Sequence, residues 1–349
     1  MLRLEYKDDS LGHSAVASFS RLVGFAAIST YFLIVLGSAV RATQSGLACP
    51  DWPLCFSSMV PEFDFQIFME WIHRVFAGAV CLFYGLIMWR FFRSKKLRSL
   101  FLGQVLLAFA LLVVQVILGG LTVLQLLEPK IVSMHLMNAL LFLGILSWMH
   151  VKAEHHSKLV QPESWRIPPV IKRSLFALSI LIFMQIFLGG MVSTTHSGLV
   201  CADFPTCHGR WFSDFAFPEW LQMGHRYFAY IIAAAVFALA MFSTGLKLPP
   251  RSKRAVRWLP VLVILQIVLG VTNVLWFVPV SVTVAHLANA VLMLIFSWTA
   301  GVELMMIRIQ YPSEGLIKRS LQSYEGDLRA GISNASSTDP KKAEPVGVS

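Results

Sequence analysis

The sequence predicts an all-α integral membrane protein, in which eight transmembrane helices form two four-helix bundles related by a pseudo-twofold axis. Three observations support this fold class: few charged residues, long charge-free apolar stretches, and an internal repeat. Of the 349 residues, 56% are hydrophobic and only 14% are charged, whereas a soluble domain carries about 25% charged residues. The composition therefore favours a lipid environment over a very apolar soluble core.

The charge-free stretches are long enough to cross the hydrocarbon core of a bilayer, which takes about 20 helical residues. One stretch, 258–302, is too long for a single span, and Pro279 divides it into two. A further span begins near Trp71 with an amphipathic turn. This span covers 75–89 with its extension to Trp71, and the other predicted spans cover 22–40, 99–127, 131–151, 174–195 and 227–246. Eight spans result.

The basic residues alternate along the chain between the predicted loops. They cluster at 90–98, 152–173, 247–257 and after 306, and the intervening loops hold almost none. This is the positive-inside pattern, so we expect both termini to be cytoplasmic and the other loops to lie on the outer face of a bacterial inner membrane. The net charge of +10 then indicates contacts with anionic lipid headgroups and not with nucleic acid. No signal peptide is predicted.

The chain repeats itself with a nearly constant offset. GSAVRATQSGLACPDWPLC (37–55) aligns with GGMVSTTHSGLVCADFPTC (189–207) at an offset of 152, and HLMNALL (135–141) aligns with HLANAVL (286–292) at 151. Each copy has an even number of spans, so both copies should have the same orientation in the membrane. The predicted division is a cytoplasmic segment 1–19, a first half 20–151, a linker 152–171, a second half 172–304 and a disordered tail 305–349.

Four of the ten histidines pair across the repeat: His73, His135, His225 and His286. Each lies near the outer start of an even-numbered span, so the two histidines of each half should lie at one depth on parallel helices. Two facing imidazoles suit a planar macrocycle that is ligated on both faces, which predicts one heme site in each half. A zinc or copper site is the alternative, but it needs three or four converging ligands.

Other residues around these histidines have two interpretations each. Arg74 and Arg226 directly follow a histidine, and together with Arg41 they are candidates for binding heme propionates or lipid headgroups. Asn138 and Asn289 lie one turn after a histidine, where they can support it or bond a neighbouring helix. The small-residue motifs at 36–38, 118–120, 188–190 and 269–271 end the odd spans, and they suit helix packing as well as cofactor access.

Four of the five cysteines lie in two predicted outer loops. Since the outer side is oxidising, we expect the disulfides Cys49–Cys55 and Cys201–Cys207. They either staple the loops or, for the first pair especially, exchange with a thiol–disulfide partner.

The two halves differ at two chemically important positions. Glu70 lies three residues before His73, on the same helix face, whereas the equivalent residue before His225 is Gln222. A carboxylate beside a heme pocket can take part in proton chemistry and an amide cannot. Arg41 is likewise replaced by Ser193. We therefore expect the N-terminal half to be chemically active and the C-terminal half to hold a permanent heme.

Several features match those of a known protein family, namely VRATQSGLACPDWPLC, the EWIHR run, the four histidines and the two cysteine loops. Through these features the sequence resembles the heme A synthase family over residues 20–304, approximately. This resemblance implies oxidation of a ring methyl of heme O to a formyl group by two successive hydroxylations. It implies that His225 and His286 hold heme b as a cofactor, and that His73 and His135 receive heme O beside the catalytic carboxylate Glu70. The cysteine pairs are those of a bacterial branch.

The resemblance also implies binding partners, and the histidine ligands leave one alternative function open. The partners are the substrate heme O, a heme O synthase (protoheme farnesyltransferase), membrane lipid and, as a further expectation, a second copy of the chain. The alternative function is a bis-histidine electron-transfer cytochrome linked to quinol, against which Glu70 and the large outer loops argue. A transporter with parallel repeats would instead place polar residues at mid-membrane.

Overall fold

The computed structural model describes residues 2–157, 167–212 and 214–307. Within these residues the chain is helical, and eight helices are long and apolar enough to cross a membrane. They are α1 (Leu2–Ala42), α2 (Phe65–Arg93), α3 (Lys95–Leu124), α4 (Pro129–Ser157), α5 (Pro169–Thr194), α6 (Phe217–Phe242), α7 (Pro250–Leu275) and α8 (Val280–Met306), with a short 3-10 helix η1 (Ser197–Leu199). The predicted all-α membrane fold is confirmed.

Local sequence explains where the helices begin and end. Asp64 caps α2 by accepting hydrogen bonds from the backbone N–H groups of Gln66 and Ile67 at 2.9 and 3.2 Å, as helix N-caps do. Ser94 alone separates α2 from α3, and its hydroxyl accepts from Leu97 N. Pro279 precedes α8, so the predicted division of 258–302 is confirmed.

Some helix ends differ from the prediction, because charged residues continue a helix beyond the apolar stretch. Helix α4 runs through the basic residues to Ser157, inside the predicted linker, and α1 includes residues assigned to the predicted N-terminal segment. Helix α6 begins at Phe217, ten residues before the charge-free stretch that predicted it. The predicted disordered tail falls mostly on 308–349, outside the described residues.

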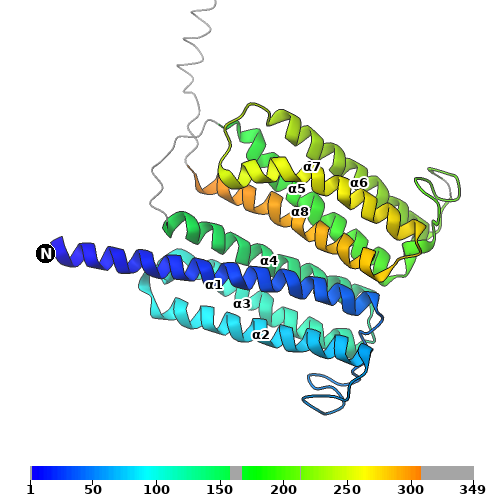
Figure 1. Cartoon of the computed structure of the whole chain (residues 1–349), viewed down its shortest axis with the longest axis horizontal. Helices are drawn as coiled ribbons and strands as arrows, with labels where there is room; N and C mark the ends of the chain where they lie inside the picture. Colours follow the sequence, from blue (N-terminus) through cyan, green and yellow to red (C-terminus); the bar gives the residue numbers. More distant parts are fainter. Residues whose placement is uncertain (1, 158–166, 213, 308–349) are drawn as a thin grey trace, which may run out of the picture.

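The helices form two neighbouring layers (Figure 1). Helices α1–α4 lie together in one layer and α5–α8 in the other, and the layers meet where α1 and α4 pack against α8 and α4 packs against α5. Several polar groups cross this contact. Trp298 donates from Nε1 to the carbonyl of Gly144 at 2.9 Å, and Arg41 donates to the carbonyl of Ser193 at 2.9 Å. A pseudo-twofold axis that relates the two layers stays a prediction.

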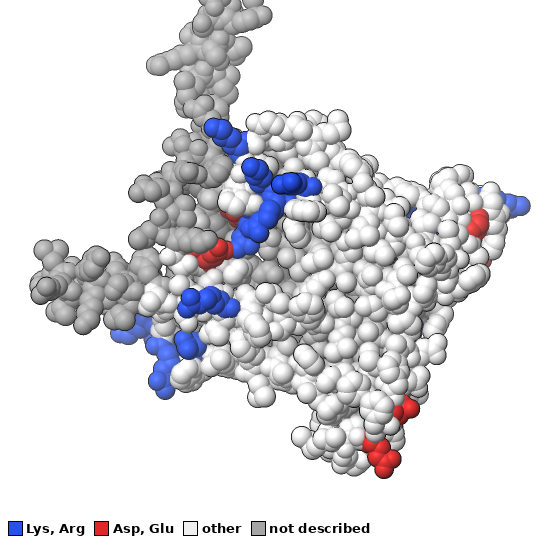
Figure 2. Space-filling view, viewed as in Figure 1, with Lys and Arg blue, Asp and Glu red and all other residues white. Residues whose placement is uncertain are grey.

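Charge lies at the two ends of the bundle. Figure 2 shows Lys and Arg side chains gathered at the end that carries the N-terminus, and almost uncharged surface along the middle of this face. At that end Arg251 forms an ion pair with Glu154, which joins α7 to α4. An apolar belt between two charged ends is the surface expected of a membrane-spanning bundle.

One buried contact at this end caps α7 from another helix. Glu303 on α8 accepts hydrogen bonds from Arg251 N at 3.1 Å, Ser252 N at 2.8 Å and Ser252 Oγ at 3.0 Å. The first backbone N–H groups of a helix have no partner within the helix, and an acidic group there also interacts favourably with the helix dipole.

We therefore predict that Glu303→Ala lowers the free energy of unfolding by about 1–2 kcal/mol, the usual cost of a lost N-cap acceptor. Thermal unfolding in detergent, followed by circular dichroism, measures this change. Glu303→Gln is the matched control, because an amide oxygen still accepts a hydrogen bond, and it should lose less than Glu303→Ala. Equal stability of Glu303→Ala and the unchanged protein would show that the cap does not stabilise the fold.

Candidate heme sites and their outer loops

The four repeated histidines lie near the N-terminal starts of four helices: His73 on α2, His135 on α4, His225 on α6 and His286 on α8. The rings of His225 and His286 lie next to each other in the C-terminal half in an edge-on arrangement, with their centroids 6.4 Å apart and their planes at 61°. In the N-terminal half, His73 and His135 are close enough for their charges to interact. The structure therefore brings each predicted pair together.

Each histidine packs against a glycine of the helix that precedes it. A Cβ atom added at Gly37, Gly119, Gly189 or Gly270 would lie 3.0–3.2 Å from Cε1 of the neighbouring imidazole, namely that of His73, His135, His225 or His286. Contacts this short push an imidazole out of place. These glycines belong to the small-residue motifs of the sequence, and their effect is to leave room for the rings.

The ring nitrogens meet the chemical requirement for holding an iron-centred cofactor. Nδ1 of His73 and Nδ1 of His225 are buried and have no hydrogen-bond partner in the described part of the chain. A buried polar atom without a partner costs free energy unless a ligand or water satisfies the site. Among the described residues, no three His, Cys, Asp or Glu side chains gather as a metal-binding group. The paired histidines thus fit a heme, which needs only two protein ligands.

His135 and His286 differ from the other two, because a glutamine side chain contacts each ring. Gln115 Nε2 lies 3.2 Å from His135 Nε2, and Gln266 Nε2 lies 3.2 Å from His286 Nε2. Sequence reasoning missed these contacts, although both glutamines occupy the same place in the repeat. The identity of these two glutamines across the repeat was the sequence signal that could have revealed the contacts.

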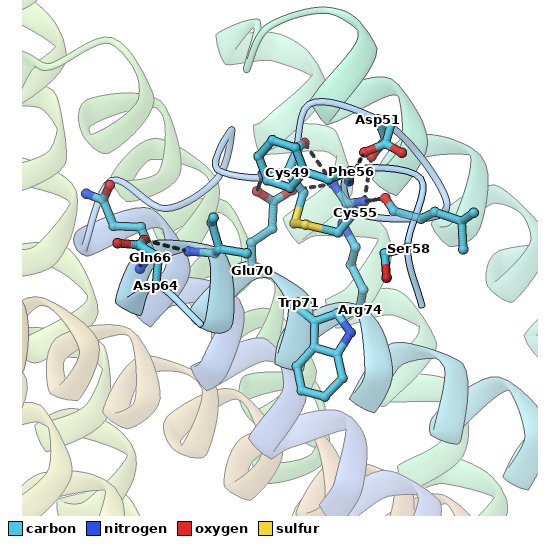
Figure 3. Close-up of a disulfide and its surroundings, with 12 residues drawn as sticks. Cys49, Asp51, Cys55, Phe56, Ser58, Asp64, Gln66, Glu70, Trp71 and Arg74 are labelled. Atoms are coloured by element: carbon cyan, nitrogen blue, oxygen red, sulfur yellow. Dashed lines mark hydrogen bonds and ion pairs between the residues drawn. A yellow bond between two sulfur atoms is a disulfide. The ribbon is translucent and has the colours of Figure 1, made fainter. Parts of the chain in front are cut away.

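Glu70 is buried, with 4% of its surface exposed, and both of its carboxylate oxygens have partners. Oε1 forms an ion pair with Arg74 at 2.5 Å, and Oε2 accepts a hydrogen bond from the backbone N–H of Cys49 at 2.8 Å. Figure 3 shows Glu70 and Arg74 reaching from α2 toward the disulfide loop. The equivalent Gln222 instead donates to the carbonyl of Gly198 at 3.1 Å. The difference found in the sequence is therefore also a difference in contacts.

Both predicted disulfides are present, Cys49–Cys55 in the loop between α1 and α2 and Cys201–Cys207 in the loop between η1 and α6. An aspartate organises each loop. Asp51 accepts from the N–H groups of Ser57 and Phe56 at 2.7 and 2.6 Å. The Ser57 bond, followed by that of Phe56, outweighs desolvation and holds the pKa of the Asp51 carboxyl below its ordinary value. Sequence reasoning also missed this role.

Asp203 takes the same role in the other loop. Desolvation acts to raise its pKa, but bonds from Gly209 N, the Thr206 hydroxyl and His208 N hold that pKa well below the ordinary value. Asp51 and Asp203 are identical across the repeat, which was the signal that could have revealed them.

The two arginines that follow a histidine bind the loops. Arg74 donates to the carbonyls of Asp51 and Leu54 at 2.6 and 2.5 Å, in addition to its ion pair with Glu70. Arg226 donates to the carbonyls of Cys201 and Thr206 at 2.7 and 2.5 Å. Each guanidinium therefore fixes its loop to the helix that carries the histidine. Propionate binding by Arg41, Arg74 and Arg226 stays a prediction.

The asparagines one turn after a histidine bond a neighbouring helix. Asn138 donates to Leu111 O at 2.9 Å and Asn289 donates to Leu262 O at 2.9 Å. Each also donates to the glutamine that contacts the histidine, Gln115 at 2.6 Å and Gln266 at 2.7 Å. Both interpretations of these residues therefore apply.

Comparisons with known proteins agree with this geometry. The chain is 29% identical over 274 residues to the heme A synthase of Bacillus licheniformis, which covers 74% of this chain and 87% of that protein. It is 27% identical over 314 residues to the heme A synthase of Shewanella oneidensis, covering 77% and 91%, and 27% identical over 328 residues to that of Maricaulis maris, covering 77% and 92%.

The profile of a protein family described as cytochrome oxidase assembly protein matches residues 20–298, which include all four histidines, both disulfide loops and Glu70. Because this match extends over far more than half of the chain, the protein belongs to that family of cytochrome oxidase assembly proteins.

Proposed function

We propose that this chain is a heme A synthase, an oxidoreductase that converts the ring methyl of heme O into the formyl group of heme A. Membership of the family and the names of the relatives support this function over that of an electron-transfer cytochrome. The observation that carries the proposal is the asymmetry between the halves. Only the N-terminal half has a buried carboxylate, Glu70, one turn before its first histidine.

We assign a different heme to each of the two histidine pairs. His225 and His286 would hold heme b, which supplies a route for electrons when bound. The centroids of their rings lie only 6.4 Å apart, which supports a shared ligand. His73 and His135 would hold the substrate heme O in the N-terminal half, where Glu70 is available. On this assignment the domain boundaries of the sequence analysis separate a substrate half, 20–151, from a cofactor half, 172–304.

Glu70 would act on the substrate through its charge. Oxidation of a methyl group removes electrons and protons, and positive charge develops at the reacting carbon where electrons leave before the proton. A carboxylate held in a fixed position stabilises such charge and accepts a proton. The Arg74 guanidinium and the Cys49 N–H fix the position of both carboxylate oxygens. Gln222 could not take this role, because an amide carries no charge.

We also propose an orientation in the membrane. The end of the bundle where Lys and Arg gather (Figure 2) would be cytoplasmic, and the disulfide loops would lie on the outer face of a bacterial inner membrane. Heme O is apolar enough to arrive through the lipid. An enzyme that makes heme O, a heme O synthase, is the partner this substrate requires, and self-association stays an expectation.

The catalytic role of Glu70 gives a prediction about the product. Expression in cells that make heme O but no heme A should yield heme A, detected by chromatography of the extracted hemes. Glu70→Gln should lower the yield roughly 100-fold or more, as expected for a lost acid–base group. The substitution keeps an oxygen that accepts from Cys49 N, so the loop should stay in place.

Its control is Glu62→Gln, which changes an exposed carboxylate of the same outer loop and should leave the yield unchanged. Heme b content should stay the same in all three proteins, because His225 and His286 are untouched. If Glu70→Gln made heme A at the normal rate with normal heme b content, the catalytic assignment of Glu70 would be wrong. If the unchanged protein held heme b but formed no heme A, the electron-transfer alternative would be favoured.

The glycines that pack against the histidines give a prediction about heme affinity. Gly189→Ala places a Cβ atom 3.0 Å from His225 Cε1, and such overpacking costs about 1–3 kcal/mol. We expect the affinity for heme b to fall roughly tenfold, which corresponds to about 1.4 kcal/mol. The measurement is a heme titration of purified apoprotein, followed by absorbance.

Gly85→Ala is the matched control, because an added Cβ there meets nothing within 4 Å. It makes the same change in helix propensity and should leave heme affinity unaltered. Unchanged affinity in Gly189→Ala would mean that this contact does not position His225.

A further inference from the structure

One histidine of each pair contacts a chain of two amides. In the N-terminal half, Asn138 Nδ2 donates to the backbone carbonyl of Leu111 at 2.9 Å and to Gln115 Oε1 at 2.6 Å. Gln115 Nε2 then lies 3.3 Å from His135 Nδ1 and 3.2 Å from Nε2. The chain of contacts runs from the backbone of α3 to the imidazole on α4.

The C-terminal half repeats these contacts with the same residue types. Asn289 Nδ2 donates to Leu262 O at 2.9 Å and to Gln266 Oε1 at 2.7 Å. Gln266 Nε2 lies 3.2 Å from both ring nitrogens of His286. Because both halves preserve every contact, the arrangement does not depend on which half carries the buried carboxylate.

The orientation of each amide follows from its partner. A backbone carbonyl can only accept, so the asparagine must present its NH2 group to Leu111 or Leu262. The same NH2 group faces the glutamine, so the glutamine must present its oxygen there and its own NH2 group to the imidazole. Asn289 Oδ1 is buried without a partner in the described residues, as this orientation requires. If the amide of Asn289 were turned over, its oxygen would face the carbonyl oxygen of Leu262, and neither atom can donate.

The other histidine of each pair has no such support. Nδ1 of His73 and Nδ1 of His225 are buried without a partner among the described residues. Gln185, the glutamine nearest to His225 in the contacts of the C-terminal half, donates to the backbone carbonyl of His225 at 2.8 Å. It therefore holds the helix and not the ring.

We propose that Gln115 and Gln266 are positioning residues, each of which aims an amide N–H at the imidazole of one histidine in its pair. In the protein without heme, the amide sets the rotation of the ring by donating to the ring nitrogen that carries no proton. Once that nitrogen binds iron, the amide faces the remaining ring N–H. Many metal-ligating histidines donate their second ring N–H to an acceptor, and this hydrogen bond makes the imidazole a stronger electron donor toward the metal. Here the glutamine places an N–H group at that position and not an acceptor. His135 and His286 are thus held as weaker donors toward iron. For His286 this inference rests on the proposed heme b site.

The test uses two substitutions in the C-terminal half, made in the full-length protein that is purified with heme b. Gln266→Leu removes the donor and leaves the ring free to rotate. We expect part of the heme to lose its sixth ligand, seen as carbon monoxide binding by the reduced protein. Asn289→Leu removes the group that orients Gln266, so its oxygen can turn toward the ring and accept the second N–H. We expect the heme to be retained and its midpoint potential to fall.

The controls separate this inference from the proposed function. Gln185→Leu also removes a partly buried amide from the C-terminal half, but one that donates to a backbone carbonyl and not to an imidazole ring, and it should change neither the potential nor carbon monoxide binding. His286→Ala should abolish tight binding of heme b. If His286→Ala kept its heme, the proposed cofactor site would be wrong, whatever the glutamine does.

A separate outcome would contradict the positioning role of the glutamine. If Gln266→Leu stayed unreactive toward carbon monoxide and Asn289→Leu kept the original potential, while His286→Ala lost its heme, the two amides would only join helices. Because Asn289→Leu leaves Gln266 in place, it tests the inference even if Gln266→Leu fails to fold.

Discussion

The structure depends on one constraint: hydrocarbon offers no hydrogen-bond partner, so the chain must satisfy its own polar groups inside the bilayer. Helices do this for the backbone. Polar side chains do it by reaching a carbonyl of another helix, as Trp298 does at Gly144 and Asn138 does at Leu111. The Nδ1 atoms of His73 and His225 are among the few buried side-chain atoms that have no partner in the described part of the chain. On the proposed function, a cofactor or substrate bound in the histidine pockets would account for such groups there.

The same constraint makes the difference between Glu70 and Gln222 important, because only one of them carries a charge. Removing a carboxylate from water costs several kcal/mol, and an ion pair offsets that cost only when the geometry is good. Glu70 meets this condition through Arg74 and the Cys49 N–H. Gln222 occupies the equivalent place with one hydrogen bond and no charge. The C-terminal half accommodates an amide at this place, so on the proposed function the charge of Glu70 serves chemistry.

The sequence was sufficient for features that depend on local composition or on the repeat. Apolar length predicted the helices, Pro279 predicted the break between α7 and α8, and the repeated spacing predicted both disulfides. The end of α4 at Ser157 was missed because charged residues continue a helix beyond the membrane as readily as they form a loop. The contact between Gln266 and His286 joins two helices, and which faces of those helices meet is a matter of packing that one sequence does not specify.

The arginines beside the histidines show how packing changes an interpretation. In the sequence, Arg74 and Arg226 stood near expected hemes, and propionates were the natural partners. In the structure, both guanidinium groups bind carbonyls of the disulfide loops. A propionate at either arginine would have to displace a loop carbonyl or share the guanidinium with it. An arginine that fastens a loop is needed in both halves, whatever each half binds, and this explains its presence after both His73 and His225. On the proposed function, the chemical difference between the halves therefore resides in Glu70, which shares the Arg74 guanidinium with the loop.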